Sequence, residues 1–296
     1  MLGAMATPDI TAFERGDTIT TDDGLDLAVY DLGGDGPDIL LVHATGFCAG
    51  VWAPVAARLD GFRVAAIDVR GHGRSDAPDL STDDAMSWQG TGADVLAAVD
   101  ALGLVDPFGV GHSMGGASLL IAELERPSTF RGLWVFEPIV MPPTFTARSG
   151  ANPLAEGARR RRAEFASARD AFDNYASKPP FDVLDPDALA AYVRDGFATG
   201  PDGSVTLRCR PEVEAATFEM GPEHHTFERL GELDVTVTVA RGRMEPGPAV
   251  FAPAIVDALA DGRIEEHPDL GHFGPLQDPA AIAASIRAAA KAAPPT

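Results

Sequence analysis

Continuous apolar runs that alternate with helical segments constrain the fold of this chain more than any other feature. The runs lie at 38–44, 62–69 and 107–112, and each has the length and even hydrophobicity of a strand buried on both faces. The segments that follow them have helical spacing and lie at 51–59, 84–102 and 113–125. Repeated strand–helix units predict parallel strands with helices on both sides. The sequence therefore predicts an α/β fold with a mostly parallel, doubly wound sheet.

The alternation is interrupted after Met141 and resumes at 234–242, where DVTVTVARG predicts another strand. The segment between them, 142–232, is richer in charged residues, proline and aromatic side chains, and it looks helical without clear strands. Because strand pairing has to continue across this segment, we expect an insertion within one fold. We predict a core formed by 1–141 and 233–296, with 142–232 as a helical cap.

The charge of the chain limits its partners. Asp and Glu number 44 against 23 Lys and Arg, which gives a formal net charge of −21. Such a surface repels nucleic acid backbones and anionic lipid headgroups, so we expect neither nucleic acid nor a membrane as a partner. No apolar run reaches the length of about 20 residues that a membrane-spanning helix needs. The oligomeric state is left open, a homo-oligomer included.

The N-terminal segment and the cysteine content indicate the compartment. The segment MLGAMATPDITAFERGD has neither the basic start nor the apolar stretch of a secretory signal. The two cysteines, Cys48 and Cys209, form no metal-ligand cluster and do not suggest a disulfide framework. We therefore expect a cytoplasmic protein.

Ser113 is the predicted nucleophile. It lies between a predicted strand and a predicted helix in PFGVGHSMGGASLL, with Gly111 and Gly115 on either side. A Gly-x-Ser-x-Gly pattern alone is a weak signal. Between a strand and a helix, however, it predicts a sharp turn that exposes the serine hydroxyl above the strand ends. The competing interpretation, a glycine-rich phosphate loop, lacks its lysine here.

A nucleophilic serine needs a base, and histidine is the side chain best suited to accept a proton near neutral pH. Of the seven histidines, His272 is the best candidate, because it lies in the loop EHPDLGHFGPLQDP before the last predicted helix. His267 in the same loop is a weaker candidate. We expect His43, His72 and His112 to be structural.

Five segments, in the same order along the chain, resemble the α/β-hydrolase family, specifically its capped esterase, lactonase and perhydrolase-like branch. They are LLVHATGFCAGVW (40–52), AAIDVRGHGRSD (65–76), GHSMGG (111–116), VARGRMEP (239–246) and GHFGPLQDP (271–279). The resemblance implies that Ser113 is the nucleophile and His272 the base. It also implies that 68–75 is a structural turn.

The resemblance also implies an oxyanion hole made of two backbone N–H groups. One belongs to Met114, the residue after the nucleophile, and the other to Thr45 in the loop after the third strand. Relatives usually carry His-Gly-x-Pro in that loop, whereas this chain has His43-Ala44-Thr45-Gly46. Two donors aimed at a developing oxyanion contribute a few kcal/mol each, about 3–4.

The acid of the triad is expected between Ser113 and His272 in the family's chain order. Glu245 follows the predicted strand 234–241 in ARGRMEPGP, at a place where relatives usually carry aspartate. Glu137 in VFEPIV, which ends the predicted strand 132–136, is the alternative, because some relatives place their acid there. We favour Glu245 and retain Glu137 as the alternative acid.

These residues predict a serine hydrolase that cleaves a carboxylic ester or lactone, a small molecule, through an acyl-enzyme intermediate. Neither a metal nor an organic cofactor is required. A serine nucleophile argues against epoxide hydrolases and haloalkane dehalogenases, which need a carboxylate. Three alternatives stay open: hydrolysis of a carbon–carbon bond in a diketone by the same triad, perhydrolysis, and a non-catalytic hydrolase-like receptor.

A run of four arginines, Arg159 to Arg162, lies in the predicted cap. We expect it to form a solvated helix face. An arginine that turned inward could instead bind a substrate carboxylate.

Overall fold

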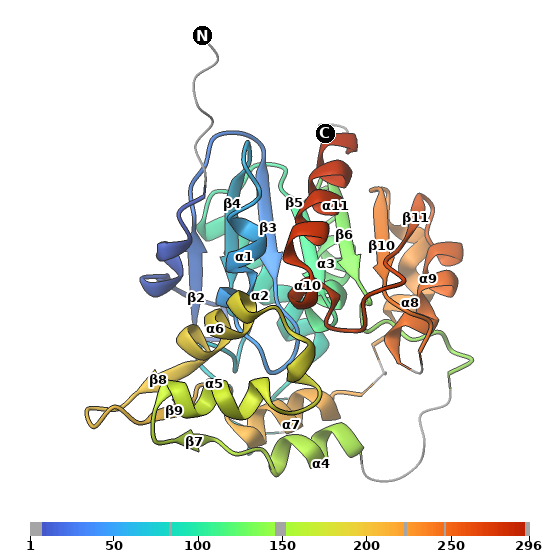
Figure 1. Cartoon of the computed structure of the whole chain (residues 1–296). Helices are drawn as coiled ribbons and strands as arrows, with labels where there is room; N and C mark the ends of the chain where they lie inside the picture. Colours follow the sequence, from blue (N-terminus) through green and yellow to red (C-terminus); the bar gives the residue numbers. More distant parts are fainter. Residues whose placement is uncertain (1–7, 83–84, 146–151, 222–223, 246, 294–296) are drawn as a thin grey trace.

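An eight-stranded sheet forms the centre of the computed structural model, which describes residues 8–82, 85–145, 152–221, 224–245 and 247–293 (Figure 1). The strand order is β1-β2-β4-β3-β5-β6-β10-β11. The strands are β1 (Asp17–Thr20), β2 (Asp26–Asp31), β3 (Asp38–Val42), β4 (Arg63–Ile67), β5 (Phe108–His112), β6 (Gly132–Phe136), β10 (Val237–Arg241) and β11 (Gly262–Glu266). Strand β2 pairs antiparallel with β1 and β4, and the other pairs are parallel. The predicted α/β fold with a mostly parallel sheet is confirmed.

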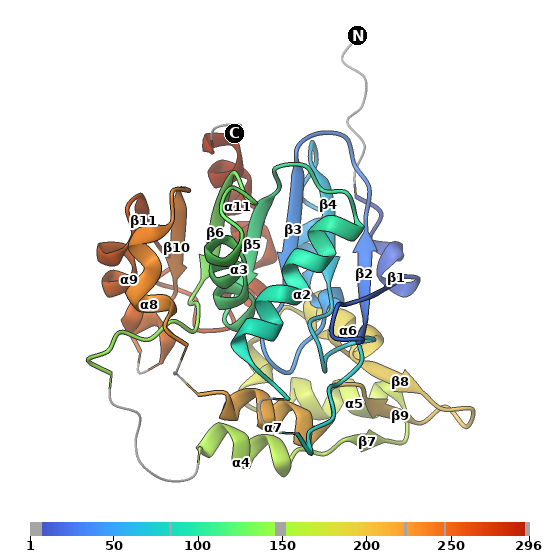
Figure 2. The same cartoon turned by 180° about the vertical axis from the view of Figure 1, so that it is seen from behind.

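Helices cover both faces of the sheet, as its fully buried strands require. Helices α1 (Ala53–Ala56) and α11 (Pro279–Ala292) lie on one face, and α2 (Trp88–Ala101), α3 (Met114–Glu125) and α9 (Ala252–Ala258) lie on the other (Figure 2). Along β3, Ile39 and Leu41 belong to the apolar cluster on the α11 side, and Leu40 and Val42 to the cluster on the α3 side. All four are fully buried, which explains why β3 reads as a continuous apolar run.

The segment predicted as a cap lies below the sheet in Figure 1, at the edge where β3, β5 and β6 end. It contains α4 (Pro153–Arg159), α5 (Ala168–Ala176), α6 (Pro186–Asp195) and α7 (Pro211–Glu219). It also contains a three-stranded antiparallel sheet of β7 (Glu164–Phe165), β9 (Val205–Leu207) and β8 (Phe197–Thr199). The expectation of a segment without strands was therefore wrong. Strands of two or three residues are too short to show a period-2 pattern in the sequence.

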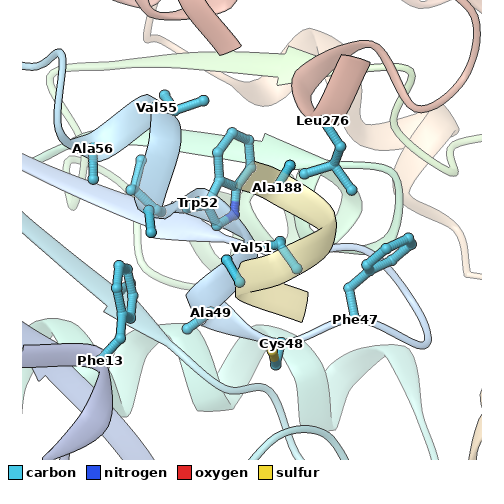
Figure 3. Close-up of a cluster of buried hydrophobic side chains, with 14 of the residues drawn as sticks. Phe13, Phe47, Cys48, Ala49, Val51, Trp52, Val55, Ala56, Ala188 and Leu276 are labelled. Atoms are coloured by element: carbon cyan, nitrogen blue, oxygen red, sulfur yellow. The ribbon is translucent and has the colours of Figure 1, made fainter. Parts of the chain in front are cut away.

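The same segment packs into the main core and shares its apolar cluster. Helix α6 lies against a 3₁₀ helix, η2 (Ala49–Trp52), that follows β3. Figure 3 shows Ala188 of α6 beside Trp52 and Val51. Strands β6 and β10, which flank the segment in the sequence, pair in parallel, so the sheet continues across it.

The remaining helices are short. They are η1 (Ile10–Glu14), η3 (Phe181–Val183), α8 (Thr226–Arg229), η4 (Leu230–Glu232), η5 (Pro248–Phe251) and α10 (Gly274–Gln277). Over the described ranges, none of the helices has the length and hydrophobicity needed to cross a membrane.

Candidate active site

Ser113 occupies a sharp turn between β5 and α3. Its backbone has φ 56° and ψ −113°, a conformation that non-glycine residues rarely adopt and that costs about 1–3 kcal/mol. Its N–H donates to the carbonyl of Phe136 on β6, at 2.9 Å. A Cβ at Gly111 would lie 2.6 Å from the backbone nitrogen of Gly116, and one at Gly115 would lie 2.6 Å from the carbonyl oxygen of His43. The flanking glycines are therefore required by close backbone packing.

His272 faces Ser113 from the loop between β11 and α10. Its Nε2 lies 3.2 Å from Ser113 Oγ, so the structure brings together the two residues predicted as nucleophile and base. The backbone of His272 is held by His112, whose Nε2 donates to the His272 carbonyl at 2.7 Å. Burial lowers the pKa of His112 well below its usual value, which favours the neutral ring in this supporting contact.

Glu137, and not Glu245, contacts His272. Glu137 Oε2 lies 2.7 Å from His272 Nδ1, and its other oxygen, Oε1, accepts from the N–H of Gly242 at 2.8 Å. The side chain of Glu137 is only 2% exposed. Its backbone has φ 45°, so the chain turns sharply as soon as β6 ends at Phe136. This turn aims the carboxylate at His272 along the same edge as Ser113.

Glu245 lies away from the histidine, which corrects the preferred expectation. Its Oε1 accepts from Arg243 Nε at 2.8 Å, and its side chain is 61% exposed. The strand before it ends at Arg241, and the next N–H, that of Gly242, is directed at Glu137. The loop after β10 thus contacts the carboxylate of Glu137 through the N–H of Gly242, and it directs Glu245 toward solvent.

The sequence placed Glu137 at the end of a strand over 132–136, and the structure confirms that end at Phe136. The apolar letters of VFEPIV also suggested a strand over 132–140, which is too long. Pro138 was the usable signal, because proline cannot donate to a strand ladder and limits the conformation of the residue before it. The left-handed backbone of Glu137 itself could not be read from residue types.

Two backbone N–H groups next to Ser113 are available as donors. Met114 is the first residue of α3, and the first N–H groups of a helix lack partners within the helix. Thr45 lies in the loop after β3, half-buried. Over the ranges that the structure describes, neither of these N–H groups donates to a protein acceptor. Both predicted oxyanion donors thus lie unpaired near the strand ends, Met114 at the start of α3 and Thr45 in the loop after β3.

A series of aromatic rings extends from the histidine toward segment 142–232. The ring of Phe273 lies 5.7 Å from that of His272, and Phe47 and Phe181 lie 5.8 and 6.1 Å from Phe273. Tyr192 of α6 lies 5.2 Å from Phe47. These rings come from the loop after β3, from η3, from α6 and from the start of α10. They give the site an apolar wall of the kind that small-molecule sites use.

The turn at 68–75, predicted to be structural, is a buried hydrogen-bonded network. Asp68 accepts from the Tyr30 hydroxyl at 2.6 Å and from the backbone N–H groups of Ala49 and Arg74 at 2.6 and 2.8 Å. Burial raises the pKa of Asp68. Through Ala49 this network fixes η2, directly after the loop that carries Thr45. Among the described residues, no group of three or more His, Cys, Asp or Glu side chains could hold a metal ion.

The fold and this site define an alpha/beta hydrolase. The model of the alpha/beta hydrolase family matches residues 39–285, and the chain belongs to that family. The predicted family is therefore confirmed, and with it the prediction that the protein is an enzyme of the hydrolase class.

Known relatives include several named enzymes. The chain is 28% identical over 264 residues to 3-oxoadipate enol-lactonase 1 of Acinetobacter baylyi, which covers 86% of each chain. It is 38% identical over 104 residues to a bifunctional esterase/perhydrolase of Acinetobacter calcoaceticus, which covers 34% of this chain and 36% of that protein.

Solved structures show the same fold. E-2-(acetamidomethylene)succinate hydrolase matches with a TM-score of 0.73 at 20% identity, over 94% of this chain and 100% of that one. The enol-lactonase of Burkholderia xenovorans LB400 matches with a TM-score of 0.69 at 19% identity, over 93% and 100%.

Proposed function

We propose that this protein is a serine hydrolase that cleaves a carboxylic ester or lactone through an acyl-enzyme intermediate. The observation that carries the proposal is one chain of contacts. Ser113 Oγ lies 3.2 Å from His272 Nε2, and His272 Nδ1 lies 2.7 Å from Glu137 Oε2. Nucleophile, base and acid in this geometry are the requirements of covalent acyl transfer.

In the first half of the reaction, His272 Nε2 takes the proton of Ser113 as Oγ attacks the substrate carbonyl. Glu137 accepts from Nδ1–H, which fixes the tautomer and stabilises the imidazolium that forms. The oxyanion is bound by the N–H groups of Met114 and Thr45. The imidazolium then gives its proton to the leaving alcohol oxygen, and an ester of Ser113 remains.

In the second half, water replaces the alcohol. His272 takes a proton from the water as its oxygen attacks the acyl-enzyme, and returns that proton to Ser113 Oγ as the acid leaves. For a lactone the released alcohol and acid belong to one product molecule. No step of this sequence requires a metal or an organic cofactor.

Two observations support an ester or lactone as substrate. Two relatives are named enol-lactonase and esterase/perhydrolase. The ring of Phe273 next to the histidine, with the rings of Phe47 and Phe181 that pack against it, suits an apolar acyl or alcohol group. Because the rings of η3 and α6 belong to 142–232, we propose that this segment acts as a cap and sets the size of the substrate.

The test combines labelling with turnover. A fluorophosphonate should label the wild-type protein at Ser113, and activated esters or lactones should be turned over steadily. Ser113→Ala should abolish labelling and reduce kcat by roughly 10⁶ while the melting temperature stays the same. Labelling without turnover of any substrate would favour a hydrolase-like receptor. Turnover of diketones but not of esters would favour carbon–carbon bond hydrolysis.

A further inference from the structure

We propose that Arg161 and Glu214 form a positioning pair that holds the oxyanion loop, residues 43–46, from the side of segment 142–232. The inference rests on the proposed function, because it assigns the pair a role in placing the N–H of Thr45. Neither residue touches the triad. The pair instead packs closely against Gly46, the residue that follows Thr45.

The pair is buried and bidentate. Arg161 Nη1 lies 2.7 and 2.6 Å from the two carboxylate oxygens of Glu214. The two side chains are 14% and 8% exposed. Water therefore screens this ion pair little, and its geometry is more rigid than that of a surface pair. Of the four arginines predicted to form a solvated face, Arg161 thus turns inward, which corrects that expectation for this residue.

Two packed helices bring the partners together. Glu214 lies on α7, and Arg161 follows the end of α4. The two helices meet through Ala155, Ala158 and Ala215, and alanines permit a close approach of the helix axes. The position of the pair is therefore fixed in part by helix packing within segment 142–232.

The oxyanion loop lies directly against this pair. A Cβ placed on Gly46 would lie 2.5 Å from Glu214 Oε1 and 3.2 Å from Arg161 Nη1. Gly46 also has φ +78°, a conformation that glycine adopts without strain. The loop backbone therefore follows the surface of the carboxylate and the guanidinium, and a shift of either group changes the space available to Gly46.

All three nitrogens of the guanidinium donate to groups within the protein. Besides Glu214, it donates through Nε to the Tyr175 hydroxyl at 3.3 Å and through Nη2 to the Tyr192 hydroxyl. The carbon of the guanidinium also lies 5.3–5.8 Å from the ring centres of Phe181, Tyr175 and Tyr192. Its charge is balanced by Glu214 and its planar group is enclosed by rings, which is the environment of a fixed structural cation.

A functional consequence follows from these contacts. Thr45 N–H stabilises the oxyanion only when it points at the position where charge develops. Because Gly46 rests on the pair, the orientation of the adjacent Thr45 amide depends on two residues of segment 142–232. The segment would then complete the catalytic machinery, in addition to shaping the substrate site.

The test changes the pair and measures kcat, KM and amide hydrogen exchange of the peptide that contains 43–48. Arg161→Lys keeps the charge but loses the fork of donors. Arg161→Met combined with Glu214→Leu removes both charges together, which avoids leaving one of them buried without a partner. We expect each variant to lower kcat by about 10- to 100-fold, less than the loss of a whole oxyanion donor. KM should stay within about twofold, and exchange in 43–48 should become faster.

A matched control lies on the same two helices. Arg159 Nη2 and Glu219 Oε2 are 2.6 Å apart, but their side chains are 43% and 45% exposed. Arg159→Lys and the combination of Arg159→Met with Glu219→Leu should change neither kcat nor exchange in 43–48. Unchanged exchange in both Arg161 variants, or an effect equal to that of the controls, would overturn the proposal. An effect on KM restricted to anionic esters would also overturn it, because Arg161 would then be a substrate ligand.

Turnover and hydrogen exchange test the proposed function and the positioning role separately. If the wild type turns over no ester or lactone, the proposed function fails, and hydrogen exchange still shows whether the pair orders the loop. If the wild type is active and exchange in 43–48 is unchanged in the variants, only the positioning role fails.

Discussion

At the scale of single residues, the site depends on two strained backbone conformations, those of Ser113 and Glu137. Ser113 and Glu137 both have positive φ, 56° and 45°, each directly after a buried parallel strand. Such strain persists only where the surrounding structure fixes it. Here the Ser113 N–H bonds the Phe136 carbonyl, and the Glu137 N–H bonds the Ala240 carbonyl. The sheet thus holds Ser113 and Glu137 in place by backbone hydrogen bonds.

Gly115 gives a prediction at this scale. A methyl group there would clash with the backbone carbonyls of Val42 and His43, so Gly115→Ala forces the start of α3 away from β3. We expect a loss of about 1–3 kcal/mol in the free energy of unfolding and a lower kcat. Gly157→Ala in α4 is the control, because nothing lies within 4 Å of its added Cβ. It should be neutral or stabilise by about 0.5–1 kcal/mol. Equal urea midpoints for the two variants would contradict this account of the turn.

Most residues of the site could be predicted from the sequence, but their geometry could not. Ser113 and His272 were recognised because a Gly-x-Ser-x-Gly turn and a late histidine loop have fixed places in a strand–helix alternation. The structure brings the two together as expected. Choosing between Glu245 and Glu137 required knowing which carboxylate turns toward His272. Glu137 does so through its left-handed backbone, φ 45°, which could not be read from residue types.

At the scale of secondary-structure elements, the buried strands were predictable and the small strands were not. A strand covered on both faces, such as β3, is a continuous apolar run. Strands β7, β8 and β9 in segment 142–232 have two or three residues each. Runs of this length are too short for an alternation to be recognised in the sequence.

The carboxyl ends of the strands also carry buried histidines, which predict a pH dependence of stability. His43 follows β3, and His72 lies in the turn after β4. Both rings are fully buried and 5.2 Å apart. The pKa of each is lowered to about 4, chiefly by burial and, for His72, also by the neighbouring ring of His43. The backbone carbonyl of Arg70 and the carboxylates of Glu214 and Asp68 act on the pKa of His72 in the opposite direction.

The sign follows from proton binding. An unfolded histidine has a pKa of about 6.5, so between pH 6.5 and 4 the unfolded state binds more protons than the folded state. The free energy of unfolding therefore falls as pH decreases through this range, by up to about 3 kcal/mol for each histidine. His72→Phe keeps a ring of similar size and removes one titrating group. Urea titrations at several pH values should show that this variant loses less stability than the wild type between pH 6.5 and 4. Parallel pH profiles for the two proteins would contradict the assignment of His72.

At the scale of the whole molecule, segment 142–232 is packed against the strand ends and shares the main apolar cluster. Phe181 of η3 lies 5.6 Å from Phe47 in the loop after β3 and 6.1 Å from Phe273 beside the histidine. The wall of the site is therefore built from three parts of the chain that are distant in sequence. The sequence predicted that this segment is inserted between two parts of the core, but not which of its side chains reach the site.

Phe181→Ala tests the proposed role of this wall in substrate size. Removing the ring enlarges the apolar space next to His272, so we expect a shift of kcat/KM toward longer acyl chains, with a smaller change for acetate esters. Val183→Ala is the matched control, because Val183 lies on the same 3₁₀ helix and is 49% exposed. A chain-length profile that is the same in both variants and in the wild type would contradict the proposed cap role.

The most direct test of the central claim is kcat on one activated ester for Glu137→Gln and Glu245→Gln. Glu137 Oε2 lies 2.7 Å from His272 Nδ1, so the amide should fail to hold the tautomer and should reduce kcat by roughly 10⁴. Glu245 contacts Arg243 in solvent, so its variant should retain kcat within about twofold, in line with the small contribution of exposed ion pairs. An inactive Glu245→Gln beside an active Glu137→Gln would contradict the Ser113–His272–Glu137 triad.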